Sequence, residues 1–465
     1  MQKIETYLKQ LDFRQGDAKT KQPECITMHE DCESRSKADK ILSAKNINNQ
    51  LVAEAQFYGK EWSLLFHEFA YWLLYSCHQQ NIKKLFFFTR EGAFFIELVK
   101  ALQKKFNLHT DIECRLLSVS RLATFLPSVD INSQNAFQRL WNIYPNQSPQ
   151  TFFKSLDIED DRLQTIYNQE YGGYYDQEIL GIAKNPIFNQ FLKDNTVNEI
   201  IKKAIASKKI LLTEYLKQNY FLDETSVGIV DIGWRGSIQD NINLIFPEKK
   251  IYGFYLGLHR QKKFIPENHF KKAFLFDGNG SAVNPLFSCL MRFVLPLEFL
   301  CTPIQDSVKR YIVDKNNKIL PETYKKVEMN VADRSISIFQ RSVLDAISSY
   351  KFTNNFRIKF CRKIAKQIIW NPKEFQIFFY RNKQFNEEFG QGISLQCYPI
   401  IESKHAPHSV KYLGTWLKAL KKSAWISGHL YHTFPKPVFR ALPTLYLIYC
   451  ALTLDSYLIP FFKLY

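Results

Sequence analysis

The sequence lacks the short motifs that mark several large enzyme classes. It contains no G-x-x-x-x-G-K-[ST] run, which excludes a P-loop nucleotide triphosphatase, and no G-x-G-x-x-G dinucleotide-binding fingerprint. A G-x-S-x-G nucleophile elbow and an H-E-x-x-H zinc motif are also absent. No D-x-D-x-T run occurs, so the chain carries no phosphatase signature of that kind.

Glycine, proline and paired cysteines are scarce as well. The 465 residues include 17 glycines and 18 prolines, too few for a collagen-like or low-complexity chain. The nine cysteines form no C-x-x-C pair, which excludes a zinc ribbon and a thioredoxin-type motif and fits a reducing cytoplasm. The amino-terminal run MQKIETYLKQ has no apolar segment of the kind that a secretory signal requires. We therefore expect a globular protein of the cytoplasm.

Positive charge is present in excess, and it is unevenly distributed. Lys and Arg number 62 and Asp and Glu number 45, which gives a net charge of +17. From Lys351 to Arg440 there are 16 Lys and Arg against 4 Asp and Glu, so most of the excess lies in the carboxyl-terminal part. A basic surface suits phosphates, nucleic acid or an anionic membrane, and charge alone does not choose among them.

Short apolar runs alternate with helical periodicity through much of the chain. Four runs are predicted to be buried strands: Leu85–Phe88, Cys114–Val119, Val227–Val230 and Ile251–Leu258. After the first run, Phe95, Leu98 and Leu102 recur at helical spacing, which indicates a strand, a tight loop and a helix. Strands that alternate with helices predict an α/β core with a mostly parallel, Rossmann-like sheet flanked by helices.

Changes in composition predict how the chain is divided. Residues 1–55 are a polar lead-in, and residues 56–310 form the α/β domain, with a helical insertion over about 124–205. Residues 311–440 are predicted to be a basic, mostly helical region. Residues 441–465 begin with an apolar stretch that is too short to span a bilayer. This stretch either lies at a membrane interface or packs as a buried helix.

A first loop, Thr89-Arg90-Glu91-Gly92, carries residue types that bind anions. It lies between a predicted strand and a helix, which is where open α/β sheets bind their ligands. Free N–H groups at the helix start, the adjacent arginine and the close backbone approach that Gly92 permits all suit an anion. The alternative is an ordinary turn in which Arg90 and Glu91 are solvated.

A second loop also lies between a predicted strand and a helix. Its residues are Asp231, Ile232, Gly233, Trp234, Arg235, Gly236 and Ser237. Two glycines, an arginine and a serine at the helix start are typical of a phosphate cradle. Asp231, predicted to be the last strand residue, would accept hydrogen bonds from sugar hydroxyls or hold a metal ion. The alternative is a structural turn with a helix cap.

A lone arginine, Arg121 in the segment SVSR, follows the predicted strand Cys114–Val119. Because the carboxyl ends of parallel strands meet at one edge of a sheet, Arg121 would join the two loops there. The alternative places its side chain on the surface.

The chain resembles a family of bacterial polysaccharide-biosynthesis proteins. Members commonly carry a strand ending in an (S/A)RDG loop, then a YxSR segment and a VDIGWxGT(I/M)Q loop. The corresponding runs here are YGKEWSLLFHEFAYWLLYSCHQQNIKKLFFFTREGAFF, SVSR, VGIVDIGWRGSIQ and IYGFYLGL. The resemblance covers residues 55–305 best, and VDIGWRG is its most specific part. Many members are fused to a haloacid-dehalogenase-type phosphatase and are described as hydrolases of that type.

The resemblance implies a phosphoribosyltransferase-like module acting on glycans. Such an enzyme transfers 5-phosphoribosyl from phosphoribosyl pyrophosphate to a glycan in capsule or O-antigen assembly and releases pyrophosphate. The resemblance implies Mg²⁺ as cofactor, a lipid-linked glycan as acceptor and a separate phosphatase that removes the 5-phosphate. It also implies a cytoplasmic protein that lies peripherally on the inner face of the cytoplasmic membrane, with no nucleic-acid partner.

The resemblance also gives roles to residues of this sequence. The donor's pyrophosphate would be bound by Arg90, Glu91 and Gly92, with Arg121 as a clamp. The 5-phosphate would be held by the second loop, whose donor-binding residues are Gly233, Trp234, Arg235, Gly236 and Ser237. Catalysis would involve Asp231, Arg235 and Glu298. Of these, Asp231 would hold the ribose hydroxyls and a metal ion, and Glu298 would orient or deprotonate the acceptor hydroxyl.

The chain departs from the family pattern at Glu91, which replaces the usual Asp of the first loop. Ordinary phosphoribosyltransferases have two adjacent acids in the second loop, whereas here Ile232 follows Asp231. Arg90 and Asp231 also lie far apart in the chain.

Two alternatives to this function stay open. A nucleotide-sugar-dependent glycosyltransferase commonly has a D-x-D motif, and the nearest run here is Glu159-Asp160-Asp161, which is typical of a solvated acidic loop. A non-catalytic basic module that binds nucleic acid or membrane would bind any polyanion in a strongly salt-dependent way. Two phosphate-type loops on one sheet edge favour an enzyme over this second alternative.

Overall fold

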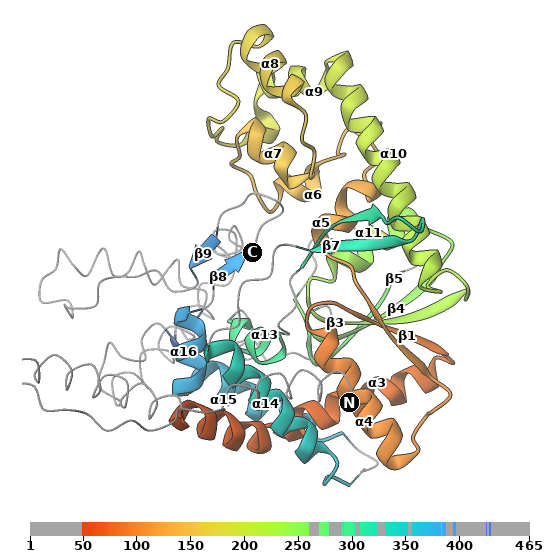
Figure 1. Ribbon diagram of the computed structural model, residues 1–465, viewed down its shortest axis with the longest axis vertical. Helices are drawn as coiled ribbons and strands as arrows, with labels where there is room; N and C mark the ends of the chain where they lie inside the picture. Colours follow the sequence, from red (N-terminus) through yellow and green to blue (C-terminus); the bar gives the residue numbers. More distant parts are fainter. Residues whose placement is uncertain are drawn as a thin grey trace, which may run out of the picture. The chain divides into compact units, whose positions relative to one another are not determined.

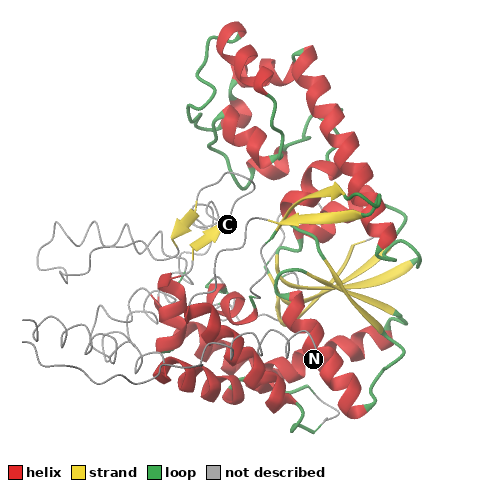
Figure 2. Ribbon diagram, in the orientation of Figure 1, coloured by secondary structure: helices red, strands yellow, loops and turns green. Residues whose placement is uncertain are grey.

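A five-stranded parallel sheet forms the centre of the computed structural model. Its strands are β1 (Lys84–Phe88), β2 (Glu113–Leu117), β3 (Ser226–Trp234), β4 (Lys250–Leu258) and β5 (His269–Asp277). Their order across the sheet is β2-β1-β3-β4-β5, and every neighbouring pair is parallel. The predicted α/β core with a helix-flanked parallel sheet is therefore confirmed (Figure 2). The four predicted strands overlap β1 to β4, whereas β5 was not predicted.

The structure describes residues 49–259, 269–278, 291, 293–302, 307–323, 331–351, 356–382, 384–386, 394–396, 425 and 427–428. Those from Leu51 onward belong to one compact unit.

Helices cover both faces of the sheet, which is why the three central strands, β1, β3 and β4, are mostly apolar and buried. Four of the covering helices are α3 (Ser63–Gln79), α4 (Gly92–Phe106), α10 (Asn195–Gln218) and α11 (Ser237–Ile245). Because side chains alternate along a strand, Leu85 and Phe87 of β1 pack with α3 and α4. Phe86 and Phe88 pack on the opposite face with α10 and α11. Figure 1 shows these two helix pairs on opposite sides of the sheet.

The strand order places the loops after β1 and β3 at a topological switch point. Phe87 of β1 pairs with Val230 of β3, so the two strands are neighbours. The chain leaves β1 through α4 toward one edge of the sheet, and it leaves β3 through α11 toward the other edge. Doubly wound sheets bind ligands beyond the carboxyl ends of strands at such a point.

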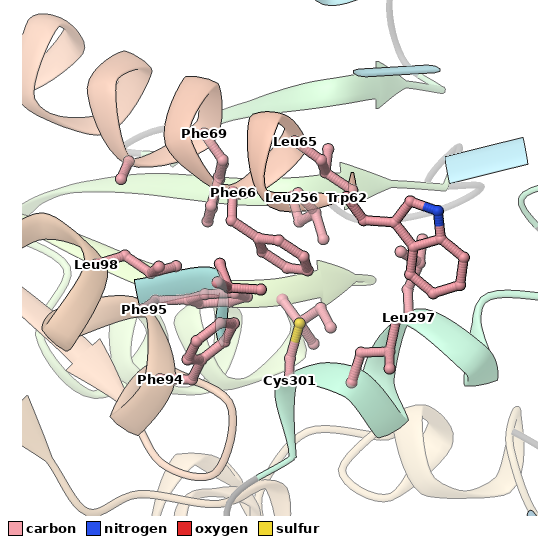
Figure 3. Close-up of a cluster of buried hydrophobic side chains, with 14 of the residues drawn as sticks. Trp62, Leu65, Phe66, Phe69, Phe94, Phe95, Leu98, Leu256, Leu297 and Cys301 are labelled. Atoms are coloured by element: carbon pink, nitrogen blue, oxygen red, sulfur yellow. The ribbon is translucent and has the colours of Figure 1, made fainter. Parts of the chain in front are cut away.

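Aromatic side chains fill the larger core cluster (Figure 3). Phe66 of α3 meets Phe94 edge to face at 5.4 Å, and Phe69 meets Phe95 in the same way at 5.0 Å. Leu297, from α13 (Leu295–Cys301), is fully buried in the same cluster. This packing attaches α13 to the sheet, near the ends of the strands that carry the predicted site.

Short helices lie between β2 and α10, where a helical insertion was predicted. They are α5 (Arg121–Phe125), α6 (Gln138–Trp141), α7 (Pro149–Ser155), α8 (Asp161–Glu170) and α9 (Pro186–Lys193). Four of them begin at side-chain caps; in α7, for example, Ser148 accepts a hydrogen bond from Thr151 N–H, and in α9 Asn185 accepts one from Phe188 N–H. The insertion has its own apolar cluster, separate from the two at the sheet.

The region predicted to be basic and helical begins with a hairpin. The hairpin strands are β6 (Val308–Val313) and β7 (Ile319–Thr323). Three helices and a short strand pair follow: α14 (Val331–Ile347), α15 (Ile358–Trp370), α16 (Glu374–Asn382), β8 (Gln384–Asn386) and β9 (Ser394–Gln396). At the other end of the chain, a helix over 49–61 starts within the predicted polar lead-in.

The predicted apolar segment 441–465 lies outside the described residues. Within the part of the chain that the structure does describe, no helix is both long and apolar enough to cross a membrane.

A buried ion pair joins α3 to the start of α15. Glu68 is 1% exposed, and its carboxylate accepts hydrogen bonds from Arg357 N–H at 2.9 Å and Arg357 Nε at 3.0 Å. Burial raises the pKa of Glu68, but hydrogen bonds with His67 and Arg357 outweigh burial and leave the pKa below its ordinary value. The ionised carboxylate therefore stabilises the contact between α3 and α15.

We expect Glu68→Gln to lower the free energy of unfolding by about 2 kcal/mol at pH 7, because the half-buried Arg357 guanidinium loses its buried counter-charge. A lowered pKa contributes stability above the unfolded-state pKa and loses it as pH falls through the folded-state value. The difference between wild type and variant should therefore shrink in acid. Urea unfolding at several pH values measures it, with the exposed Glu61→Gln as control. A difference independent of pH would contradict this account.

Candidate functional site

The first predicted loop connects β1 to α4 in a tight turn. Thr89 N–H donates to Leu117 O of β2 at 3.1 Å, which ties the loop to the neighbouring strand. A Cβ atom at Gly92 would lie 2.9 Å from the carbonyl carbon of Phe87, so glycine permits the close approach of helix and strand. The N–H groups of Ala93 and Phe94 donate to Arg90 O at 3.1 Å and to Glu91 O at 3.0 Å. An anion beyond the end of β1 would therefore depend on the positive end of the α4 dipole and on Arg90.

Glu91 is buried at this turn although it carries a carboxylate. It is 3% exposed, and its Oε1 accepts no hydrogen bond from the described residues. Arg90 Nε lies 3.5 Å from the same oxygen. A buried carboxylate oxygen without a hydrogen bond is costly, so its place at the end of β1 is a sign of function.

The second loop differs from the prediction in where its strand ends. β3 continues to Trp234, because Gly233 and Trp234 still pair with β4, so Asp231 is not the last strand residue. Successive side chains therefore face opposite sides of the sheet. Ile232 packs in the core cluster shared with α3 and α4, and an acid at this position would be buried among apolar side chains.

The end of this loop has a backbone conformation that favours glycine. Gly233, Trp234 and Gly236 all have positive φ values, of 110°, 61° and 63°. A Cβ atom at Gly233 would collide with the carbonyl oxygen of Gly257. Gly236 occupies the cap position of α11, and Ser237 is the first helical residue, in agreement with the predicted helix start. The amide groups of this first turn suit a second anion.

The charges of several predicted site residues act on the carboxyl group of Asp231. Burial raises its pKa to about 7, and the charge of Glu91 adds to the rise. The hydrogen bond from Ile232 N–H, at 2.8 Å, and the charges of Arg90 and Arg121 act in the opposite direction. The structure thus brings the loops after β1, β2 and β3 to one edge, with two carboxylates and two guanidinium groups in electrostatic contact.

Glu298 of α13 reaches the same edge from a distant part of the sequence. Its Oε1 accepts a hydrogen bond from the indole N–H of Trp234. Burial raises the pKa of Cys301 well above its usual range, and the charges of Glu91 and Glu298 add to that rise. Cys301 is thus close enough to feel the charges of both Glu91 and Glu298. Together with the hydrogen bond to Trp234, this shows that Glu298 lies at the edge that carries the two loops.

Sequence reasoning missed Lys271 of β5, whose side chain donates hydrogen bonds to the second loop and to the helix that follows it. Its side chain is 2% exposed, and its Nζ donates to Asp240 Oδ1 at 2.7 Å and to Arg235 O at 3.3 Å. Burial lowers the pKa of Lys271, while the charge and hydrogen bond of Asp240 oppose that effect. The signal was a lysine before the apolar run Ala273–Phe276, which marks a further buried strand.

Buried polar side chains extend this support under the start of α11. Tyr255 OH donates to Gln239 Oε1 at 2.6 Å, and Gln239 Nε2 donates to Ile251 O at 2.8 Å. Both side chains are fully buried. These bonds hold the first turn of α11 against β4 and so fix the position of the adjoining Gly236 and Ser237.

A polar cavity of about 270 Å³ lies at the opposite end of the sheet, near the amino ends of β1 and β2. Its lining groups pair with one another: Lys83 Nζ donates to Asp111 at 2.6 Å, and the rings of His78 and His109 lie 4.4 Å apart. We place the functional site at the carboxyl edge instead, because the perturbed charges converge there.

No family model matches the sequence, and no curated protein matches it either. Among the described residues, no group of three or more His, Cys, Asp or Glu is arranged to hold a metal ion. The geometry of the carboxyl edge is therefore the basis for assigning a function.

We expect Asp231→Asn to stabilise the ligand-free protein at pH 8 by about 1–2 kcal/mol. At this pH the half-buried carboxylate of the wild type is ionised, which lowers its free energy of unfolding, and the neutral amide of the variant avoids that cost. A raised carboxyl pKa contributes stability below the unfolded-state pKa and loses it as pH rises through about 7. The gain should therefore be smaller at pH 5. Urea unfolding at both pH values measures it. Equal destabilisation at both would contradict the assignment, and the exposed Asp223→Asn is the control.

Proposed function

We propose that this protein is a phosphoribosyltransferase-type glycosyltransferase. It transfers 5-phosphoribosyl from phosphoribosyl pyrophosphate to a glycan of a capsule or O-antigen and releases pyrophosphate. The observation that carries the proposal is that two loops, each leading into a helix, meet near Asp231 at the switch point of the sheet, where Arg90 and Arg121 act on its charge. A donor with a phosphate group at each end of a ribose has the chemistry that such an edge recognises.

Each loop would take one end of this donor. The turn after β1 offers the start of α4 and Arg90 to the pyrophosphate, with Arg121 close enough to share its charge. The start of α11, with Gly236 and Ser237, would take the 5-phosphate. Asp231, between the two, would accept hydrogen bonds from the ribose hydroxyls. Binding both ends fixes the sugar carbon C1 for attack, and such positioning supplies a large part of catalysis.

The residues at this edge fit Mg²⁺ when the donor supplies most of the ligands. Mg²⁺ in proteins is commonly held by one or two carboxylates together with substrate phosphates. Glu91 has a buried oxygen that accepts no hydrogen bond from the described residues, and its charge acts on Asp231. These two carboxylates, from separate loops, replace the adjacent acids of ordinary phosphoribosyltransferases. Bound Mg²⁺ would neutralise charge on the departing pyrophosphate.

The transfer breaks the bond between C1 and the pyrophosphate oxygen and forms a bond between C1 and the acceptor oxygen. Arg90 and Arg121 stabilise the negative charge that develops on the leaving group. The acceptor hydroxyl gives its proton to Glu298, whose carboxylate is oriented by the indole N–H of Trp234. Attack from the face opposite pyrophosphate inverts the configuration at C1.

The acceptor and the product define the partners of this enzyme. A glycan under assembly is carried on a lipid at the inner face of the cytoplasmic membrane, so we propose a cytoplasmic, peripheral location. The product retains its 5-phosphate. A separate phosphatase would remove it and leave ribofuranose.

Calorimetric titration with phosphoribosyl pyrophosphate and Mg²⁺ tests the donor. We expect saturable binding to wild type and at least tenfold weaker binding to Asp231→Ala. The variant loses the carboxylate that would accept hydrogen bonds from the ribose hydroxyls and contribute to Mg²⁺ binding. Asp223→Ala, which removes an exposed acid before β3, is the matched control. Thermal unfolding confirms that each variant is folded. If wild type binds a nucleotide sugar and not phosphoribosyl pyrophosphate, the donor assignment fails.

Glu298→Gln separates donor binding from transfer. The variant keeps an oxygen that accepts the Trp234 hydrogen bond but cannot accept the acceptor's proton. We expect unchanged donor affinity and a transfer rate lower by about 10²–10⁴-fold. Release of pyrophosphate in the presence of a glycan acceptor measures the rate. An unchanged rate would remove Glu298 from the mechanism.

A further inference from the structure

Helix α15 presents a strongly basic face to solvent. Its sequence, IKFCRKIAKQIIW, contains four Lys or Arg and no Asp or Glu. The opposite face is anchored in the protein, because Cys361, Ala365, Ile368 and Ile369 are all fully buried. The helix is therefore held rigidly, with one side committed to the core and the other side open.

The exposed lysines form a single stripe along this helix. Lys359, Lys363 and Lys366 are all exposed, and their spacing of four and three residues places them on one face. None of the three makes an ion pair with another described residue. Arg362, by contrast, turns inward, and its Nε donates to Leu275 O of β5 at 2.7 Å. The stripe thus carries three unneutralised positive charges over about two helical turns.

Aromatic side chains border the lysines at the amino-terminal end of α15. Phe360 is 61% exposed, more than any other phenylalanine whose exposure the structure describes. Phe356 lies four residues earlier, and Tyr75 of α3, itself 42% exposed, meets Phe356 edge to face at 5.6 Å. Lysines beside exposed aromatic rings match the boundary between lipid headgroups and acyl chains.

We propose that this face of α15, which we call the basic stripe, docks the protein on a bilayer that contains anionic phospholipid. The lysines would neutralise headgroup charge, and Phe360 would enter the headgroup region. Lysines together with a protruding phenyl ring on one amphipathic helix are typical of an interfacial membrane helix. A phenyl ring can also stack on unpaired bases, so RNA is the competing occupant that the test separates from lipid. The docking proposal rests on the peripheral membrane location proposed above, whereas the donor and the reaction are tested separately.

Vesicle sedimentation with the full-length chain tests the proposal. The vesicles contain phosphatidylcholine alone or phosphatidylcholine mixed with phosphatidylglycerol. The test variant is Lys359→Gln combined with Lys363→Gln and Lys366→Gln. Its matched control removes three exposed lysines of α10, through Lys202→Gln, Lys203→Gln and Lys209→Gln.

We expect wild type to bind the anionic vesicles and to bind phosphatidylcholine vesicles weakly. Removal of the basic stripe should weaken partitioning on the order of a hundredfold, since each lysine near an anionic surface contributes about fivefold. The α10 control should stay close to wild type. Phe360→Ser should remove the part of the binding that survives high salt, because that part is apolar.

Three results would overturn the proposal. Wild-type partitioning by the stripe variant would show that other parts of the chain bind the membrane. An equal loss in the α10 control would show that only total charge matters. RNA binding is measured in parallel with a single-stranded RNA. If wild type binds this RNA but not the anionic vesicles, and the stripe variant loses RNA binding, the face belongs to nucleic acid. Thermal unfolding of all variants excludes a loss caused by misfolding.

Discussion

The pairing of β1 with β3 is the constraint on which the rest of this structure depends. Phe87 and Val230 lie side by side in the sheet although a helix, a strand and the whole helical insertion separate them in sequence. Because the strands are parallel, their following loops emerge at one edge. Because the chain then turns to opposite faces, these loops diverge and leave two helix starts at the switch point.

Electrostatics at this edge is unfavourable in the ligand-free protein. Asp231 and Glu91 repel each other, and burial of Asp231 makes its charge costly, so its pKa rises to about 7. Arg90 and Arg121 offset only part of that cost. A ligand that brings hydroxyl donors to the carboxylates and negative charge to the helix starts would satisfy both sets of groups at once. The energetic cost of the empty edge is thus consistent with a binding function.

The sequence predicted the sheet and its two loops because local patterns specify them. Apolar runs between polar turns identify β1 and β4, and the glycines of the second loop indicate a special backbone there. Other features depend on contacts between distant residues. The length of β3 is set by pairing with β4 beyond Asp231, and the role of Lys271 depends on its place beneath Gly236. A buried lysine in a strand carries no local sign of the loop that it supports.

A crystal structure of the protein with phosphoribosyl pyrophosphate and Mg²⁺ tests the central claim most directly. The account predicts the pyrophosphate against Arg90 and Gly92, the ribose hydroxyls at Asp231 and the 5-phosphate against Gly236 and Ser237. Density for the donor at the cavity beside His78, or none at the carboxyl edge under saturating donor, would contradict it.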